Sequence, residues 1–280
     1  MSVAHAALLF LLQIAFGSML TFLVNDREAL GPKYFKVSGW IMLGLYGLAG
    51  WLCWGAALDP NALPWQQHLG IAVGAAAFGM LAFSSISGWD QPMLERVLLI
   101  GSLIAGGWAV VLSAWHVVPL SIELTDLERA LVIASAFASS LVLGYTTWGM
   151  ILGHWYLVAP GLHIKHLAQI VNPMPWVFAL QILVSSFALW LMWDHVLGPG
   201  NATMDDMLAR SPERVADVLF VWVRIPVGLL VPIVLAMMTR VTVKMEKTQP
   251  ATGILYAMCV LVYMGDLMGK LVEGSTAVPL

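Results

Sequence analysis

Charge is the first thing this sequence lacks. Asp, Glu, Lys and Arg make up 10% of its 280 residues, while hydrophobic residues make up 60%. Soluble domains carry about 25% charged residues, so the shortage indicates a surface that mostly faces lipid. The net charge of −3 and the lack of a basic cluster argue against nucleic acid as a partner, because phosphate binding needs clustered Lys and Arg.

Cysteine and the common catalytic motifs are also scarce. The two cysteines, Cys53 and Cys259, sit in apolar runs and are interpreted as small buried hydrophobes, not as a disulfide framework. No CxxC or CxxCH sequence occurs, which leaves c-type haem and Cys-ligated iron–sulfur clusters without ligands. HExxH, Walker A and nucleophile-elbow patterns are missing as well, so no metal site is predicted.

Long apolar runs are what the sequence has in abundance. Runs of about 20 residues recur, enough for a helix to cross a hydrocarbon core of about 30 Å, and none shows the alternation of a membrane strand. The sequence therefore predicts an all-α fold, a polytopic transmembrane bundle forming one integral membrane domain over 1–280. Eight spans are expected, the first retained rather than cleaved as a signal peptide: 5–24, 36–57, 68–87, 95–115, 126–158, 167–193, 216–239 and 252–273.

The Lys and Arg residues predict the orientation of these spans. Most fall in loops on one side, and the positive-inside rule places that side in the cytoplasm and both termini outside, on the periplasmic or extracellular side. The expected location is a bacterial inner membrane. The acidic stretch 195–215 would then be an outer loop, a candidate cap or docking segment. The inner loops hold Arg27, Lys33, Lys36, Arg96, Lys165, Arg240, Lys244 and Lys247.

Tryptophan and glycine add two further expectations. Indoles are expected in belts at both interfaces, with Trp148 and Trp155 in the inner belt. Small residues at helical spacing predict close helix packing. These glycines are Gly44, Gly47 and Gly50 in the second span, Gly70 and Gly74 in the third, and Gly265 and Gly269 in the eighth.

Three charged residues fall inside the last two spans. Arg224 and Asp266 each lie roughly seven residues from the outer ends of their spans, about 10 Å deep, and Lys270 follows Asp266 by one turn on the same helix face. A cluster of the three is therefore expected. It would either fix helix register, with side chains that pair or snorkel, or serve as a proton path or a site for quinone or an anionic group, since charge within a membrane is costly.

A second group of candidates lies at the inner end of the fifth span and the start of the sixth. Imidazole can shuttle protons or hydrogen-bond a quinone carbonyl, aromatic rings can line a headgroup pocket, and the nearby Pro173 and Pro175 loosen a helix. Histidines that only anchor a helix end are the alternative. The candidate quinone site consists of His154, Trp155, Tyr156, His163, His166, Asn172 and Trp176.

A haem site is a third expectation. Haem b needs only two axial ligands, and four histidines lie near the outer boundary. His68 and His116 are the pair selected as candidate ligands.

In size and helix number the chain resembles, in outline and over its whole length, the quinone-reactive membrane anchors of bacterial respiratory complexes of the NrfD and polysulfide-reductase type. The resemblance implies an integral membrane subunit of an electron-transfer complex that binds quinone, and haem if the histidine pair serves, and that docks to extramembrane redox subunits. It assigns no role to any residue.

Two other functions stay open. A small-solute or ion transporter would show midplane polar sites on broken helices, usually with an internal repeat. A non-catalytic structural subunit of a larger membrane complex would need only the packing faces. The short loops leave no room for a soluble catalytic domain, which disfavours an enzyme that acts alone.

Overall fold

A computed structural model describes residues 3–25, 27–59, 63–89, 91–116, 124–159, 161–192, 220, 222–276 and 278–279. Throughout these ranges the regular structure is helical, without strands. Eight helical segments are long and apolar enough to cross a membrane, which confirms the predicted fold class and the number of spans. The stretch 195–215 lies outside the described residues.

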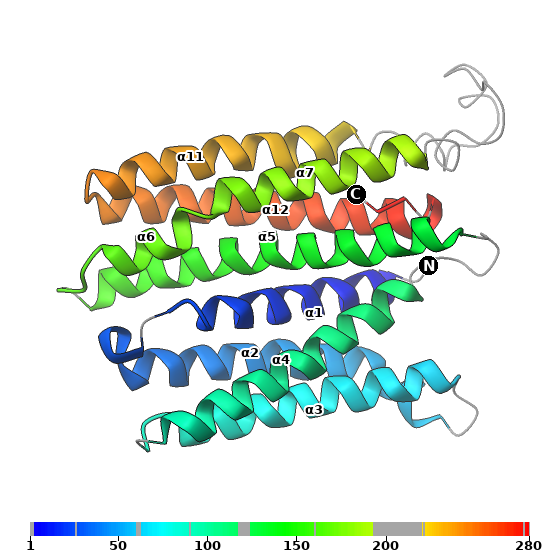
Figure 1. Cartoon of the computed structure of the whole chain (residues 1–280), viewed down its shortest axis with the longest axis horizontal. Helices are drawn as coiled ribbons and strands as arrows, with labels where there is room; N and C mark the ends of the chain where they lie inside the picture. The colour runs from blue at the N-terminus through cyan, green and yellow to red at the C-terminus, as the bar shows by residue number, and fades with distance from the viewer. Residues whose placement is uncertain are drawn as a thin grey trace.

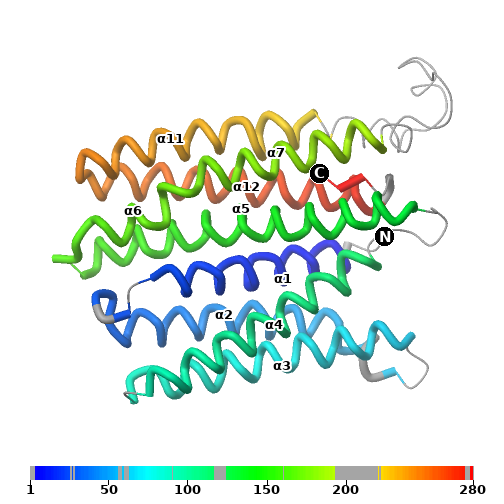
Figure 2. The backbone as a smooth tube through the Cα atoms, in the orientation of Figure 1, coloured from blue at the N-terminus to red at the C-terminus, as the bar shows by residue number. Residues whose placement is uncertain are grey.

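The helices lie side by side along one common direction (Figure 1), and the backbone trace follows the chain back and forth between the two ends of the bundle (Figure 2). Both chain ends lie at the same end of the bundle (Figure 1). The elements are α1 (Val3–Phe22), α2 (Arg27–Leu58), α3 (Pro64–Ile86), α4 (Pro92–Trp115), α5 (Asp126–Val158), α6 (Lys165–Val171), α7 (Met174–Leu191), the π-helical turn η1 (Pro226–Leu230), α11 (Val231–Lys244) and α12 (Thr248–Thr276).

Helices α1 and α5 form the middle of the bundle. α1 packs against α2, α4 and α5, while α5 also packs against α7 and α12. α3 lies beyond α2 and α4, and α11 lies beyond α12. Contacts between α5 and α12 therefore join the centre of the bundle to its C-terminal helices.

The outer surface of the bundle is apolar. Large side chains such as Trp51, Ile71 and Trp190 are 68–75% exposed, far more than a soluble surface would tolerate in a continuous band. By helix length and composition the chain is an integral membrane protein.

The start of α2 differs from the hydropathy prediction. α2 begins at Arg27, nine residues before the expected start at 36, because hydropathy detects only the apolar part of a helix. Gly31 lies inside this helix with φ 75°, a left-handed conformation that favours glycine, and the following Pro32 cannot donate a backbone hydrogen bond. The expected break at Gly31–Pro32 is thus a kink, and Lys33 and Lys36 lie on α2 rather than in a loop.

At the start of α5 the predicted capping box is present. The Thr125 side chain accepts from the backbone N–H of Glu128 at 3.3 Å, and the Glu128 carboxylate accepts from the backbone N–H of Thr125 at 2.7 Å. These bonds satisfy two backbone donors that a helix start leaves open.

Two spans are interrupted. The sixth consists of α6 and α7, separated at Asn172 and Pro173, as expected from its prolines. The seventh contains η1, and it continues to Lys244, beyond the expected end at 239. Nothing in the hydropathy pattern indicated this π-helical turn, which is a local widening often found at functional sites.

Among the expected glycines, Gly265 makes a tight helix contact, because a Cβ there would run into the backbone of Gly228. Gly44, Gly47 and Gly74 have open space beside them. By contrast, a Cβ on Gly17 would run into the carbonyl oxygen of Ser140, and a Cβ on Gly144 would run into the backbone of Gly17. The sequence spacing of glycines shows where helices can approach, not which face meets a neighbour.

Trp148 also departs from the predicted belt. Its side chain is fully buried, and its ring lies 4.6 Å from that of Phe22 and 5.9 Å from that of Tyr34. It belongs to the aromatic core between α1, α2 and α5, because α5 is enclosed by other helices at this depth.

The glycine contact between α1 and α5 gives a test of the packing. Gly17→Ala should lower the free energy of unfolding by about 1–3 kcal/mol, since overpacking forces the backbones apart. The measurement is the thermal unfolding midpoint in detergent. Gly44→Ala is the matched control, an equal change beside open space, and equal midpoints for the two variants would contradict the α1–α5 contact.

Candidate functional site

Four charged side chains meet in the interior of the bundle. The Arg224 guanidinium lies 3.5 Å from the Asp266 carboxylate, and the Lys270 ammonium lies 3.8 Å from both Asp266 and Glu273. All four side chains are at most 4% exposed. We call Arg224, Asp266, Lys270 and Glu273 the charge network. Its formal charges cancel, which is the condition for keeping ions in a low-dielectric interior.

Helix geometry lines up three members of the network. Asp266, Lys270 and Glu273 are spaced by four and three residues, so they lie above one another on one face of α12. Asp266 lies ten residues before the end of α12 at Thr276, about 15 Å along the helix axis. The network thus reaches from near the helix end into the membrane interior.

Neighbouring helices complete the surroundings of Asp266. The Ser139 hydroxyl of α5 donates a hydrogen bond to the Asp266 carboxylate. Arg224 comes from the segment just before η1, where Gly228 lies against Gly265 of α12. A Cβ on Gly228 would lie 2.9 Å from the Arg224 Nη1 atom, so these glycines leave the room that the guanidinium occupies.

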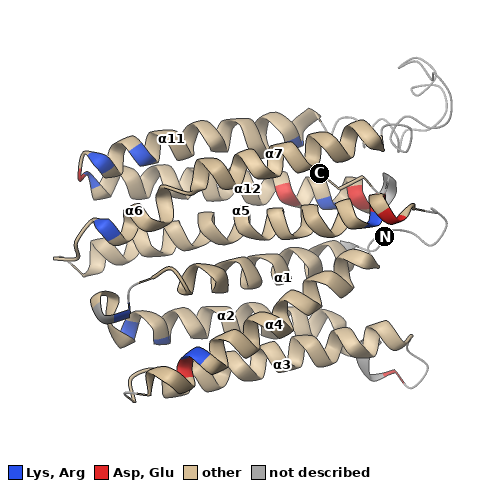
Figure 3. Ribbon diagram, in the orientation of Figure 1, with Lys and Arg blue, Asp and Glu red and all other residues tan. Residues whose placement is uncertain are grey.

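The distribution of charge along the bundle is uneven. Lys and Arg gather at the end where α6 starts and α11 finishes, whereas the acidic residues of α12 lie toward the opposite end (Figure 3). The charge network is therefore at the end of the bundle that carries both chain termini.

The candidate inner residues fall into two groups. Tyr156 donates to the carbonyl of His163 at 2.6 Å and accepts from the backbone N–H of Leu167 at 3.3 Å, so its hydroxyl ties the end of α5 to α6. His166, which precedes Leu167, is buried. The ring of Trp155 packs 5.5 Å from that of Tyr34.

The remaining inner candidates point elsewhere. Trp176 is 72% exposed, and Asn172 and His163 are exposed. His154 is exposed on α5, where its Nδ1 atom lies 3.2 Å from the hydroxyl of Tyr256 on α12. The seven candidates thus share one end of the bundle but not one cavity wall.

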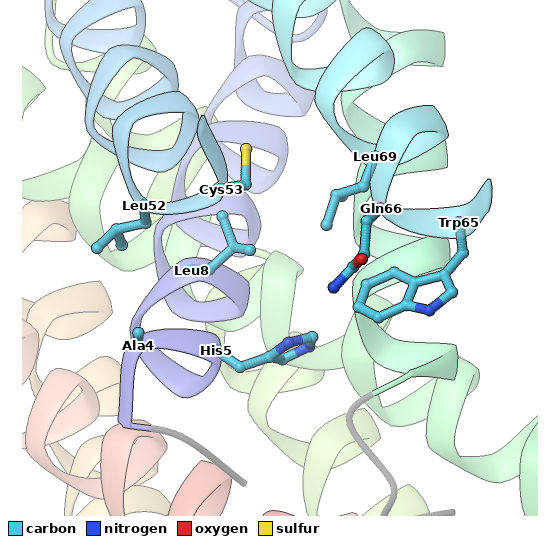
Figure 4. A pocket seen from close by; sticks show the side chains of 8 residues that line it. All are labelled: Ala4, His5, Leu8, Leu52, Cys53, Trp65, Gln66 and Leu69. Carbon is cyan, nitrogen blue, oxygen red and sulfur yellow. The ribbon is translucent and has the colours of Figure 1, made fainter. Parts of the chain in front are cut away.

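A pocket lies at the opposite end, between the start of α1, the end of α2 and the start of α3. Its volume is about 170 Å³, and its polar or aromatic lining consists of His5, Cys53, Trp65 and Gln66 (Figure 4). The Nε2 atom of His5 lies 3.1 Å from the carbonyl oxygen of Ser113. The contact of His5 with Trp65 could not be predicted, because no periodic pattern links the two residues.

The two candidate haem ligands have different surroundings. The ring of His116 stacks on that of Trp65, with centroids 4.2 Å apart and planes 15° from parallel. Burial lowers the pKa of His116, and nearby His5 lowers this pKa further, so its imidazole is neutral at pH 7. His68 is exposed on α3, and His5 lies close enough to His116 to affect its pKa.

Comparison with known protein families, curated sequences and solved structures found no match to this chain. Function is therefore inferred from its own side chains.

Removing one charge from the network should destabilise the fold. After Asp266→Asn, Glu273 is the one carboxylate left in the network to balance Arg224 and Lys270. Breaking a buried ion pair costs about 3–5 kcal/mol. Chemical denaturation in detergent measures the loss. The double variant Asp266→Asn/Lys270→Met removes one charge of each sign and should recover part of it. A double variant that loses the sum of both single effects would show that the two side chains are not coupled.

Proposed function

We propose that this chain is an integral membrane subunit of an electron-transfer complex of the respiratory type, which binds quinone and docks to extramembrane redox subunits. The single observation that carries the proposal is the charge network, four buried ionisable groups within apolar helices. Ionisable groups in a membrane interior are costly, and they typically mark proton relays or substrate sites.

Quinone chemistry explains why such groups would be kept. Reducing a quinone takes up protons together with electrons, and oxidising a quinol releases them. A protein that performs this chemistry inside lipid needs carboxylates or other exchangeable groups to move those protons. In the proposal, Asp266 exchanges the proton, and Arg224 and Lys270 stabilise its charged form.

The headgroup itself is proposed to bind in the pocket beside α1. Trp65 offers an aromatic face, and His5 and Gln66 offer hydrogen-bonding atoms, the combination that fixes the orientation of a planar ligand. The pocket volume of about 170 Å³ suits a single ring rather than haem. Haem bound through His68 and His116 stays a second, separate prediction.

The proposed location is a bacterial inner membrane with both termini outside. Its support is the gathering of Lys and Arg at one end of the bundle (Figure 3), which the positive-inside rule assigns to the cytoplasm. The charge network and the pocket would then both lie toward the outer side, where the stretch 195–215 is the candidate docking segment.

An ion-coupled transporter is the second candidate. The observation that favours it is the pair of interrupted spans, α6–α7 and η1–α11, with Arg224 directly before η1. Transporters place substrate sites at such interruptions. Uptake of a labelled solute by liposomes containing the chain, lost in Asp266→Asn, would place this function first.

Purification in mild detergent tests the electron-transfer proposal. The chain should carry about one extractable quinone per copy, since a pocket of this size holds one ring, and should copurify with a redox-active partner. Trp65→Ala should reduce the quinone content because it removes the aromatic face. Gln67→Ala, on the same helix but exposed, is the control.

A reduced-minus-oxidised absorption spectrum of the same sample tests for haem, which His68→Ala would then abolish. Samples with neither quinone nor a redox-active partner would contradict the proposal.

A further inference from the structure

One face of α12 is polar along most of its length. Its residues are spaced alternately by three and four positions, which keeps them on one side of a helix. They are Tyr256, Cys259, Tyr263, Asp266, Lys270 and Glu273. This polar face includes three members of the charge network and continues beyond them, away from the end that carries the termini.

Three polar side chains of helix α5 contact this face. Ser139 donates to Asp266, the Thr147 hydroxyl lies 2.7 Å from the Tyr263 hydroxyl, and His154 lies 3.2 Å from the Tyr256 hydroxyl. The three α5 residues are spaced by eight and seven positions, so they also share one helix face. Each bond joins the same two helices at a different depth.

The polar face of α12 covers most of the membrane. From Tyr256 to Glu273 is 17 positions along α12, a rise of about 26 Å, against a hydrocarbon core of about 30 Å. Glu273 lies three residues before the end of α12, and His154 lies four residues before the end of α5. The two extremes therefore lie near opposite ends of the bundle.

The side chains between Glu273 and His154 are of chemical types that can relay protons. Tyr263 and Thr147 are hydroxyls bonded to each other, and the thiol of Cys259 lies beside both. Successive members on α12 are one helical turn apart, about 5–6 Å between Cβ atoms, a gap that one bridging water can close. Apolar residues would pack two helices equally well, so helix packing alone does not require this series.

We propose that the polar face between α5 and α12 conducts protons across the membrane, between Glu273 at one end and His154 at the other. A proton arrives on one oxygen or nitrogen as that group releases its own proton to the next. One proton enters from one aqueous side and one leaves on the other, with no electron transferred and no bond changed at the end of the cycle.

This path shares Asp266 with the proposed electron-transfer function, but it does not require quinone to be bound. Quinone binding is assigned to the pocket beside α1, whereas the path runs through α5 and α12. A chain that conducts protons and holds no quinone would support the path and remove the electron-transfer proposal. A chain that holds quinone and conducts no protons would support electron transfer and remove the path.

Proton flux into liposomes tests the path. The full chain is reconstituted with an enclosed pH-sensitive dye, and a potassium diffusion potential with valinomycin drives protons inward. Vesicles with the chain should acidify faster than empty vesicles. Thr147→Val and Tyr263→Phe, which keep the shape of each side chain and remove its hydroxyl, should each slow the flux by about tenfold or more, as loss of a proton-transfer group does.

Thr146→Val is the matched control. It makes the same change one residue away in α5, where the buried Thr146 hydroxyl donates to the carbonyl of Val142. Its flux should stay at the original rate. The proposal is overturned if the unaltered chain conducts no faster than empty vesicles, or if Thr146→Val slows the flux as much as Thr147→Val.

Discussion

The lack of water in the bilayer interior is the constraint on which this structure depends. Any charge or hydroxyl placed there must find its partner within the protein. The interface of α5 with α12 meets this demand, because Ser139, Arg224 and Lys270 surround the Asp266 carboxylate. Close helix contacts make the arrangement possible. Gly17 lets α1 approach α5, and Gly228 lets the segment before α11 approach α12. Apolar packing builds the rest of the bundle around this polar seam.

Most of the fold can be predicted from the sequence because hydropathy follows directly from lipid contact. The eight spans and the capping box of Thr125 and Glu128 are examples. The start of α2 is missed, since its polar first turns carry no hydropathy signal. The turn η1 is missed because a π-helical turn differs from an α-helix in bonding each carbonyl to the N–H five rather than four residues later, and not in composition. The buried position of Trp148 depends on which helices enclose α5, and no local pattern contains that information.

The candidate site is only partly predictable. Periodicity alone brings Asp266 and Lys270 together and, continued by one more step, would have added Glu273. Ser139 and Thr147 could not be found, since buried serines and threonines are common and only the packing of α5 on α12 selects these two. The inner quinone site stays a prediction, although its residues have different surroundings. Trp176 belongs to another helix, α7, and is exposed, while His154 lies on α5 beside Tyr256 of α12.

The central claim is that Asp266 exchanges a proton inside the membrane. Infrared difference spectroscopy of the reconstituted chain, recorded on adding a quinol, measures this directly. The account predicts a change in the carbonyl stretching band of a protonated carboxyl group that shifts in deuterated water and disappears in Asp266→Asn. Spectra of the original chain and of Asp266→Asn that are identical in this region would contradict it, and the charge network would then be a device for holding helices together.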